Sequence, residues 1–124
     1  MKASDLADVE TELGVVLPEA YRGAMLAYPL DPTDANSRIA LPDDARAVIA
    51  FNRFLREQFP DEWPPTYFAV GNGPCGDPYF LDLGTRSAAV WSWDHETHGV
   101  TRAAPDFGSW LVVLRSLEAG TGRA

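Results

Sequence analysis

"FAVGNGPCGDPYFLDL", residues 68–83, joins two apolar runs through a segment rich in glycine and proline. Short apolar, aromatic and β-branched runs bounded by Gly, Asn, Asp or Pro are typical of β-strands. The connection is too short for a crossover helix, so the two strands are expected to run antiparallel. Gly71, Gly73 and Gly76 are therefore predicted to be structural residues of the turn between them.

Two more runs of the same kind follow, "AAVWSW" at residues 88–93 and "GVTRA" at residues 99–103. The turn "DHETHG" joins them. Together with "TYFAV" and "YFLDL" on either side of the glycine-rich turn, they make four strands with short connections. This spacing predicts a meander of antiparallel strands.

Helical periodicity is present before and after these strands, at residues 4–13, 18–28, 43–59 and 106–119. The residues expected to begin or end these helices are Ser4, Gly14, Pro18, Pro42, Asp43, Asp106 and Gly120. Residues 29–41 are predicted to form a loop and then a short extended piece. The order indicates an α+β fold, an antiparallel β-meander packed by N-terminal helices and a C-terminal helix. We expect one domain over residues 1–124, with a frayed tail from about residue 120.

The composition favours a protein partner over nucleic acid. The chain has 124 residues, with 18 acidic and 10 basic side chains and a formal net charge of -8. Such a surface repels phosphate backbones and attracts a basic protein, so no direct nucleic-acid binding is expected. The oligomeric state stays open.

The sequence also predicts where the chain is located. A single cysteine excludes an internal disulfide, which fits a reducing compartment. The start "MKASDLADVE" is too acidic for a secretion signal, and the apolar run "WLVVL" is too short to span a bilayer. We expect a cytoplasmic protein without a membrane segment.

The glycine-rich turn does not have the features of a phosphate or nucleophile site. A phosphate cradle needs a lysine or a helix directly after the glycines, whereas a strand follows here and the only lysine is Lys2. Cys75 as a nucleophile would need a nearby base, which His95 or His98 could supply across the sheet. A tolerated small residue is the favoured interpretation of Cys75. We expect no cofactor.

"DHETH", residues 94–98, superficially resembles a metal motif. The zinc protease motif places two histidines four residues apart on one helix face, whereas His95 and His98 are three apart in a turn. A third ligand, such as Asp77 or Glu96, would have to come from elsewhere. A solvated polar turn without metal is therefore predicted.

Trp91 and Trp93 lie two residues apart in a strand and are predicted to share one face of the sheet. They could supply the surface that Phe107 and Trp110 cover. Core packing is the favoured role, because aromatic side chains bury large areas. An exposed anchor for a partner is the alternative.

Four segments in order give the chain a family resemblance. They are "VETELGVVLPEAYRGAML", "FAVGNGPCGDPYFLDL", "VWSWDHET" and "APDFGSWLVVL". In this order and spacing they resemble the SUKH superfamily, the Smi/Knr cell-wall regulator-like proteins, over nearly the whole chain. The resemblance implies a non-enzymatic α+β binding domain. In bacteria such proteins commonly resemble immunity proteins of polymorphic toxin systems, which neutralise a cognate toxin, often a nuclease, by direct binding.

The resemblance also suggests which residues contact a partner. Its turn motifs match Asn72, Asp77, Asp94, His95 and Glu96, and Trp91 and Trp93 complete the candidate partner-binding set. Asp77 could instead hydrogen-bond the loop amides and fix its own turn. No catalytic residue is expected. The alternatives are a regulatory or scaffold protein that binds a cellular protein and, less favoured, a small metal- or thiol-dependent enzyme.

Overall fold

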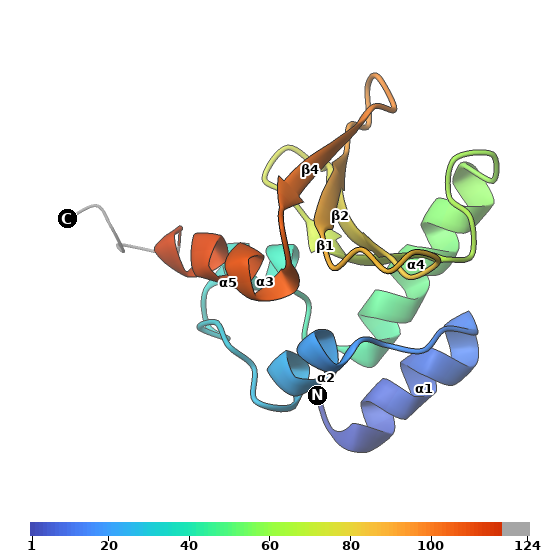
Figure 1. Ribbon diagram of the computed structural model, residues 1–124. Helices are drawn as coiled ribbons and strands as arrows, with labels where there is room; N and C mark the ends of the chain where they lie inside the picture. Colours follow the sequence, from blue (N-terminus) through green and yellow to red (C-terminus); the bar gives the residue numbers. More distant parts are fainter. Residues whose placement is uncertain (118–124) are drawn as a thin grey trace.

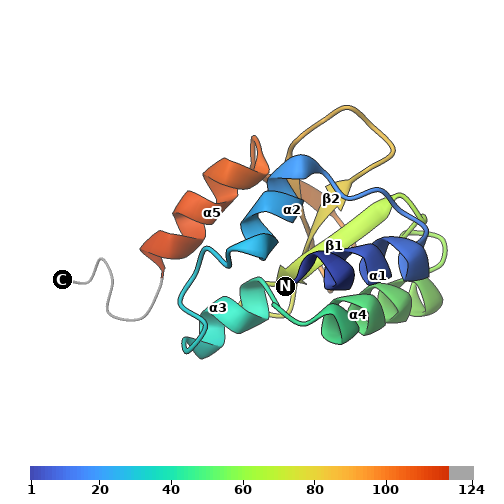
Figure 2. The ribbon, with the colours of Figure 1, turned by 90° about the horizontal axis from the view of Figure 1, so that it is seen from below.

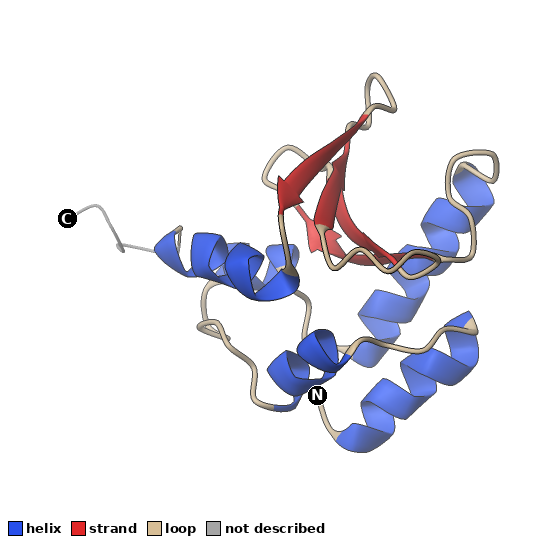
Figure 3. Cartoon of the chain, viewed as in Figure 1, coloured by secondary structure: helices blue, strands red, loops and turns tan. Residues whose placement is uncertain are grey.

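The computed structural model describes residues 1–117 of the chain (Figure 1). These residues form five helices and one sheet of four strands, which confirms the α+β class (Figure 3). The elements are α1 (Ala3–Leu13), α2 (Glu19–Leu26), α3 (Ala35–Ala40), α4 (Ala45–Gln58), β1 (Tyr67–Asn72), β2 (Pro78–Asp82), β3 (Val90–Trp93), β4 (Val100–Ala104) and α5 (Phe107–Ser116). Gly120 and the predicted frayed tail lie outside the described residues. In the described part of the chain, no helix has the length and apolar character needed to cross a membrane.

The sheet is the predicted antiparallel meander, with strand order β1-β2-β3-β4. The register shifts between Ala69 and Gly71 and again between Val90 and Trp91. Each shift is an irregularity of the β-bulge type, which bends the strand and increases the local twist. The sheet is therefore curved rather than flat.

Most of the predicted helix ends are confirmed within a few residues. Gly14 ends α1 in the left-handed conformation, with φ of 67°, and Asp106 caps α5 by accepting a hydrogen bond from the amide of Ser109. Ser4 was expected to cap α1 but lies inside the helix. Lys2 is the cap residue instead, because the carboxylate of Asp5 accepts a hydrogen bond from the Lys2 amide.

The predicted loop and extended piece over residues 29–41 are partly wrong, because Ala35–Ala40 form the helix α3. The carboxylate of Asp34 accepts a hydrogen bond from the amide of Asn36 and caps the helix. At the C-terminal end of α3, the hydroxyl of Tyr28 donates a hydrogen bond to the Leu41 carbonyl at 2.6 Å. A helix of six residues is not stable alone, so this cap and the packing of α3 on the sheet account for it.

Helices α1, α2 and α5 lie on one side of the sheet (Figure 2). A first core cluster fills the space between them and this face of the sheet. Tyr21 is central to it, with its ring 5.0 Å from that of Phe68 and 5.6 Å from that of Phe107. The buried members are Leu6, Val9, Leu13, Leu17, Tyr21, Met25, Leu30, Leu41, Val48, Phe68, Val70, Leu81, Val90, Ala104, Phe107, Trp110 and Leu114.

A second core cluster covers the opposite face of the sheet, where alternate residues of the strands point. Its buried members are Leu55, Trp63, Ala69, Phe80 and Trp93. The Trp63 ring lies edge-on to both other large aromatics, 5.1 Å from Phe80 and 6.0 Å from Trp93. The C-terminal half of α4 and the segment after it therefore pack against a face that α1, α2 and α5 leave open.

Asn52 joins α4 to the edge strand β1. Its side chain is buried, and its carbonyl oxygen accepts a hydrogen bond from the Ala69 amide at 2.7 Å. Its amide nitrogen donates to the carbonyls of Ala69 and Val48, both at 3.0 Å. The Asn52 side chain thus supplies the hydrogen-bond partners that a further strand would give to Ala69. It thereby protects this part of the sheet edge from pairing with another chain.

Candidate partner-binding edge

The predicted polar residues come together at one end of the sheet. In a meander, the first and third turns lie at the same end, so the β1–β2 turn and the β3–β4 turn are neighbours. We call the side chains that these two turns bring together the acidic edge: Asp77, Asp94, His95 and Glu96. The third turn is the orange loop at the top of Figure 1.

Asp77 and His95 tie the two turns together. The carboxylate of Asp77 accepts a hydrogen bond from the backbone amide of His95 at 3.1 Å, and its oxygen lies 2.5 Å from Nδ1 of the imidazole. This hydrogen bond raises the pKa of His95 above its usual value, and the negative charges of Asp77, Glu96 and Asp94 act in the same direction. Asp77 therefore bonds an amide of the neighbouring turn, which corrects the expectation that it fixes its own.

Asp94 organises the third turn. Its carboxylate accepts hydrogen bonds from the amides of Glu96 at 2.7 Å and Thr97 at 3.1 Å. These two bonds lower the pKa of Asp94, because they stabilise the charged carboxylate. Asp94 thus carries its negative charge at neutral pH while it holds the loop. Glu96 lies exposed beside it.

Three glycines lie in or next to the first turn, Gly71 at the end of β1 and Gly73 and Gly76 in the turn itself. The Gly73 amide donates to the Asp77 carbonyl at 2.8 Å, and the Gly76 amide donates to the Gly73 carbonyl at 3.0 Å. Gly76 has φ of 88°, which other residues rarely adopt. Gly71 lies where any side chain would meet the backbone carbonyl of Ala40 at the end of α3. Cys75 is exposed in this turn as a free thiol.

The two histidines diverge. Ligand atoms of Asp77, Asp94 and His95 lie within 4.8 Å of one another. His98 instead stacks on Trp93 at 4.7 Å and pairs with the carboxylate of Glu62. Both aspartates already accept hydrogen bonds from the turns, so a metal would have to compete with these bonds. The absence of a metal stays a prediction.

Trp91 and Trp93 both pack on the second core cluster, which confirms that they share one face. Trp93 is 2% exposed, so its role is core packing and it is not an exposed anchor. Trp91 is half-buried. The expectation that this pair lies under Phe107 and Trp110 is wrong, because those two residues belong to the first cluster on the other face. Trp63, in the irregular segment between α4 and β1, contacts Trp93 instead.

A groove of about 380 Å³ that the sequence did not reveal borders the acidic edge. Asn72, Gly73 and Pro74 of the first turn line it on one side. Its other walls come from α3 and from the C-terminal half of α5. Asn72 therefore lines the groove and does not belong to the acidic edge, although it lies next to the same turn as Asp77.

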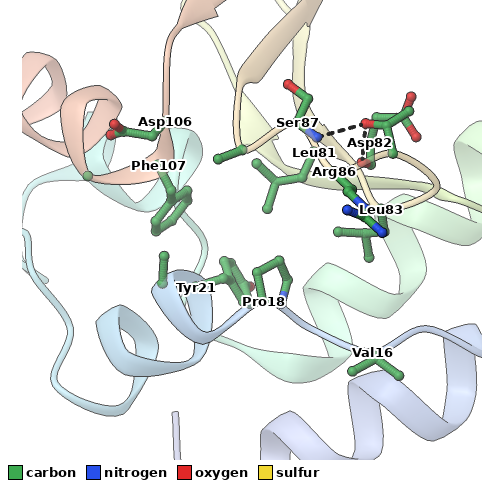
Figure 4. Close-up of a pocket in the computed structure, with 14 residues that line it drawn as sticks. Val16, Pro18, Tyr21, Leu81, Asp82, Leu83, Arg86, Ser87, Asp106 and Phe107 are labelled. Atoms are coloured by element: carbon green, nitrogen blue, oxygen red, sulfur yellow. Dashed lines mark hydrogen bonds between the residues drawn. The ribbon is translucent and has the colours of Figure 1, made fainter.

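A second cavity, of about 510 Å³, lies at the opposite end of the sheet (Figure 4). The β2–β3 loop forms one wall, with Leu83 and Arg86, and the beginnings of α2 and α5 form the other, with Pro18 and Phe107. Tyr21 contributes to its lining. The tyrosine hydroxyl has no hydrogen-bond partner among the described residues, and burial raises its pKa. None of the candidate partner-binding residues lines this cavity.

The geometry defines a small α+β domain built on a curved four-stranded meander, with two hydrogen-bonded polar turns at one end. Residues 1–112 match the family model described as SMI1 / KNR4 family (SUKH-1). The chain therefore belongs to this family, which confirms the resemblance seen in the sequence. No curated protein and no solved structure matches the chain.

Proposed function

We propose that this chain is a non-enzymatic protein-binding domain, and specifically a bacterial immunity protein that neutralises a cognate toxin in the cytoplasm by direct contact. Membership of the SMI1 / KNR4 family is the observation that carries the proposal. The net charge of -8 supports a basic partner, because it accelerates the approach of positively charged proteins.

The polar side chains that a catalytic site would use have structural partners instead. Asp77 and Asp94 hold the two turns, and His98 is packed between aromatic rings. Cys75 lies exposed, and no histidine is hydrogen-bonded to it among the described residues. These contacts favour a binding role over the alternative of a small metal- or thiol-dependent enzyme.

The acidic edge is the surface through which we expect the toxin to approach. Asp77, Asp94 and Glu96 come from two turns that are hydrogen-bonded to each other, so the edge is organised before binding. Preorganised side chains lose less conformational entropy when a complex forms. The carboxylates of Asp77 and Asp94 are therefore held in place before binding, and Glu96 adds an exposed negative charge beside them.

Co-expression tests the proposal. We expect a gene next to this one to encode the toxic domain. That domain is produced in cells together with this chain, and survival is compared with cells that produce the domain alone. The proposal predicts survival only when the chain is present. Death in both cases, with the chain abundant and folded, would contradict the immunity function and favour a scaffold that binds another cellular protein.

A further inference from the structure

The groove beside the acidic edge is a mostly apolar hollow on the protein surface. We call it the α3–α5 groove. Its walls combine apolar side chains with a few polar groups, and its volume of about 380 Å³ is in the range of ligand-sized pockets. The lining residues on the helix side are Asn36, Ser37, Ile39, Ala40, Leu114 and Leu117.

Tight contacts between neighbouring elements hold the groove open. At Gly71 the backbone of β1 approaches that of Ala40 so closely that no side chain fits between them. The Tyr79 ring lies 5.1 Å from that of Trp110, which is buried in the first core cluster. Gly73 leaves the Tyr79 ring uncovered, because an added Cβ there would lie 3.3 Å from it. The groove is therefore part of the folded structure and does not need a partner to form.

Apolar side chains are exposed around this groove. Ile39 on α3 is 51% exposed, and Leu117 after α5 is 66% exposed. Val113, one helical turn before Leu117, does not line the groove but is also 49% exposed. Single exposed apolar residues are common on protein surfaces, but several around one hollow indicate an interaction site.

Electrostatics decides which partner fits. The β1–β2 turn belongs to both the groove and the acidic edge. Gly73 and Pro74 line the groove, and Asp77 of the same turn is part of the acidic edge. Two exposed cations lie near the groove: Arg38 of α3, and Arg115 of α5, whose side chain donates a hydrogen bond to the Pro29 carbonyl and keeps its charge. The net charge of -8 outweighs both. A second copy of this chain would bring another charge of -8 to the interface and be repelled. A basic segment is attracted instead.

We infer that the α3–α5 groove seats an apolar side chain of a basic protein segment, whose Lys or Arg residues contact the acidic edge across the β1–β2 turn. The inference deepens the proposed function and rests on it only for the identity of the partner as a toxin. The apolar side chain loses its contact with water in the groove, which slows dissociation. The basic residues set the approach and the orientation.

The test uses the purified chain and synthetic peptides, so it does not need a toxin. The probe is acetyl-Arg-Lys-Leu-Leu-Lys-Arg-amide, and the control peptide replaces both leucines by serine at the same charge. Amide chemical shifts of the labelled chain locate each peptide. We expect the leucine peptide to shift Ile39, Gly73 and Leu117 and to bind at least threefold more tightly than the serine peptide.

Two variants that change the net charge equally make the test specific. Ile39→Lys places a cation in the α3–α5 groove. Val16→Lys places one at the cavity at the opposite end of the sheet, where Val16 is 83% exposed. Ile39→Lys should weaken the leucine peptide at least threefold, and Val16→Lys should leave its affinity within experimental error. Circular dichroism checks that both variants fold.

Three results would overturn the inference. They are equal affinity for the two peptides, shifts confined to the opposite cavity around Leu83 and Phe107, and equal effects of the two variants. Each of these results is independent of whether the chain neutralises a toxin. Toxin neutralisation can fail while the groove binds the leucine peptide, and it can succeed through the acidic edge alone.

Discussion

The carboxylate of Asp77 accepts hydrogen bonds from both the backbone and the ring of His95, 18 residues further along the chain. One side chain thereby joins the β1–β2 turn to the β3–β4 turn. The two ends of this contact carry opposite charges whenever His95 is protonated. The contact should therefore depend on pH.

The first prediction concerns His95→Ala. Because the folded state raises the pKa of His95 above its usual value near 6.5, the stabilisation from the charged pair is fully present below that value. It is lost as the pH rises through the folded pKa. The variant should lower the urea midpoint more at about pH 5.5 than at about pH 8.5. The same substitution in an Asp77→Asn background should show a smaller difference, because only the charges of Asp94 and Glu96 then act on His95. An equal loss at both pH values in the wild-type background would contradict the account.

The second prediction concerns the buried amide of Asn52. Asn52→Leu leaves the amide and carbonyl of Ala69 without their side-chain partner. Each buried backbone group left unpaired costs about 1–3 kcal/mol, so the free energy of unfolding should fall by at least about 2 kcal/mol. The exposed neighbour Arg53, paired with Glu12, provides the control, and Arg53→Leu should cost less than about 1 kcal/mol. Similar losses in urea denaturation for the two variants would mean that the edge does not depend on Asn52.

The third prediction compares two glycines. A Cβ at Gly71 would fall on the backbone carbonyl of Ala40, which cannot move without displacing α3 from the sheet. Gly71→Ala should therefore destabilise the protein by at least about 2 kcal/mol, as overpacking does elsewhere. Gly23 on α2 has open space around it, so Gly23→Ala should stabilise the helix by up to about 1 kcal/mol. Thermal unfolding measures both, and a neutral Gly71→Ala would show that α3 does not pack against β1 in this way.

The fourth prediction is that the purified chain retains no stoichiometric zinc after dialysis. Asp77, Asp94 and His95 lie close together, but the imidazole already pairs with Asp77 and Asp94 holds two amides of its turn. Zinc sites in proteins need ligands free to form a tetrahedral arrangement. Elemental analysis tests this directly. About one equivalent of zinc, lost in the His95→Ala variant, would establish a metal site at the acidic edge.

Local sequence signals were enough to predict the sheet and most helix ends. The four strands and the caps at Gly14 and Asp106 depend on a few neighbouring residues, and the meander follows from the short connections. Helix α3 was missed because its sequence contains turn-forming residues, and its stability depends on contacts with Tyr28 and β1. Such contacts join distant parts of the chain and leave no periodic signal.

The candidate site was predictable only in outline. A meander brings the turns with Asp77 and His95 to the same end, but the side-chain bond between them depends on rotamers and on the curvature of the sheet. The burial of Trp93 was predicted, but its contact with Trp63 was not, because Trp63 lies in an irregular segment without a periodic signal. The α3–α5 groove could not be predicted, since one of its walls is the helix that the sequence did not indicate.

The most direct test of the central claim is the rate at which the purified chain binds and inhibits the toxic domain of the neighbouring gene, measured against salt. We expect inhibition at equimolar protein and an association rate that falls steeply between about 50 and about 500 mM NaCl. Glu96→Lys at the acidic edge should lower this rate more than Glu57→Lys, which makes the same charge change at an exposed position of α4. An association rate indifferent to salt, or equal effects of the two variants, would contradict steering by the acidic edge. No inhibition even at excess chain would contradict the immunity function itself.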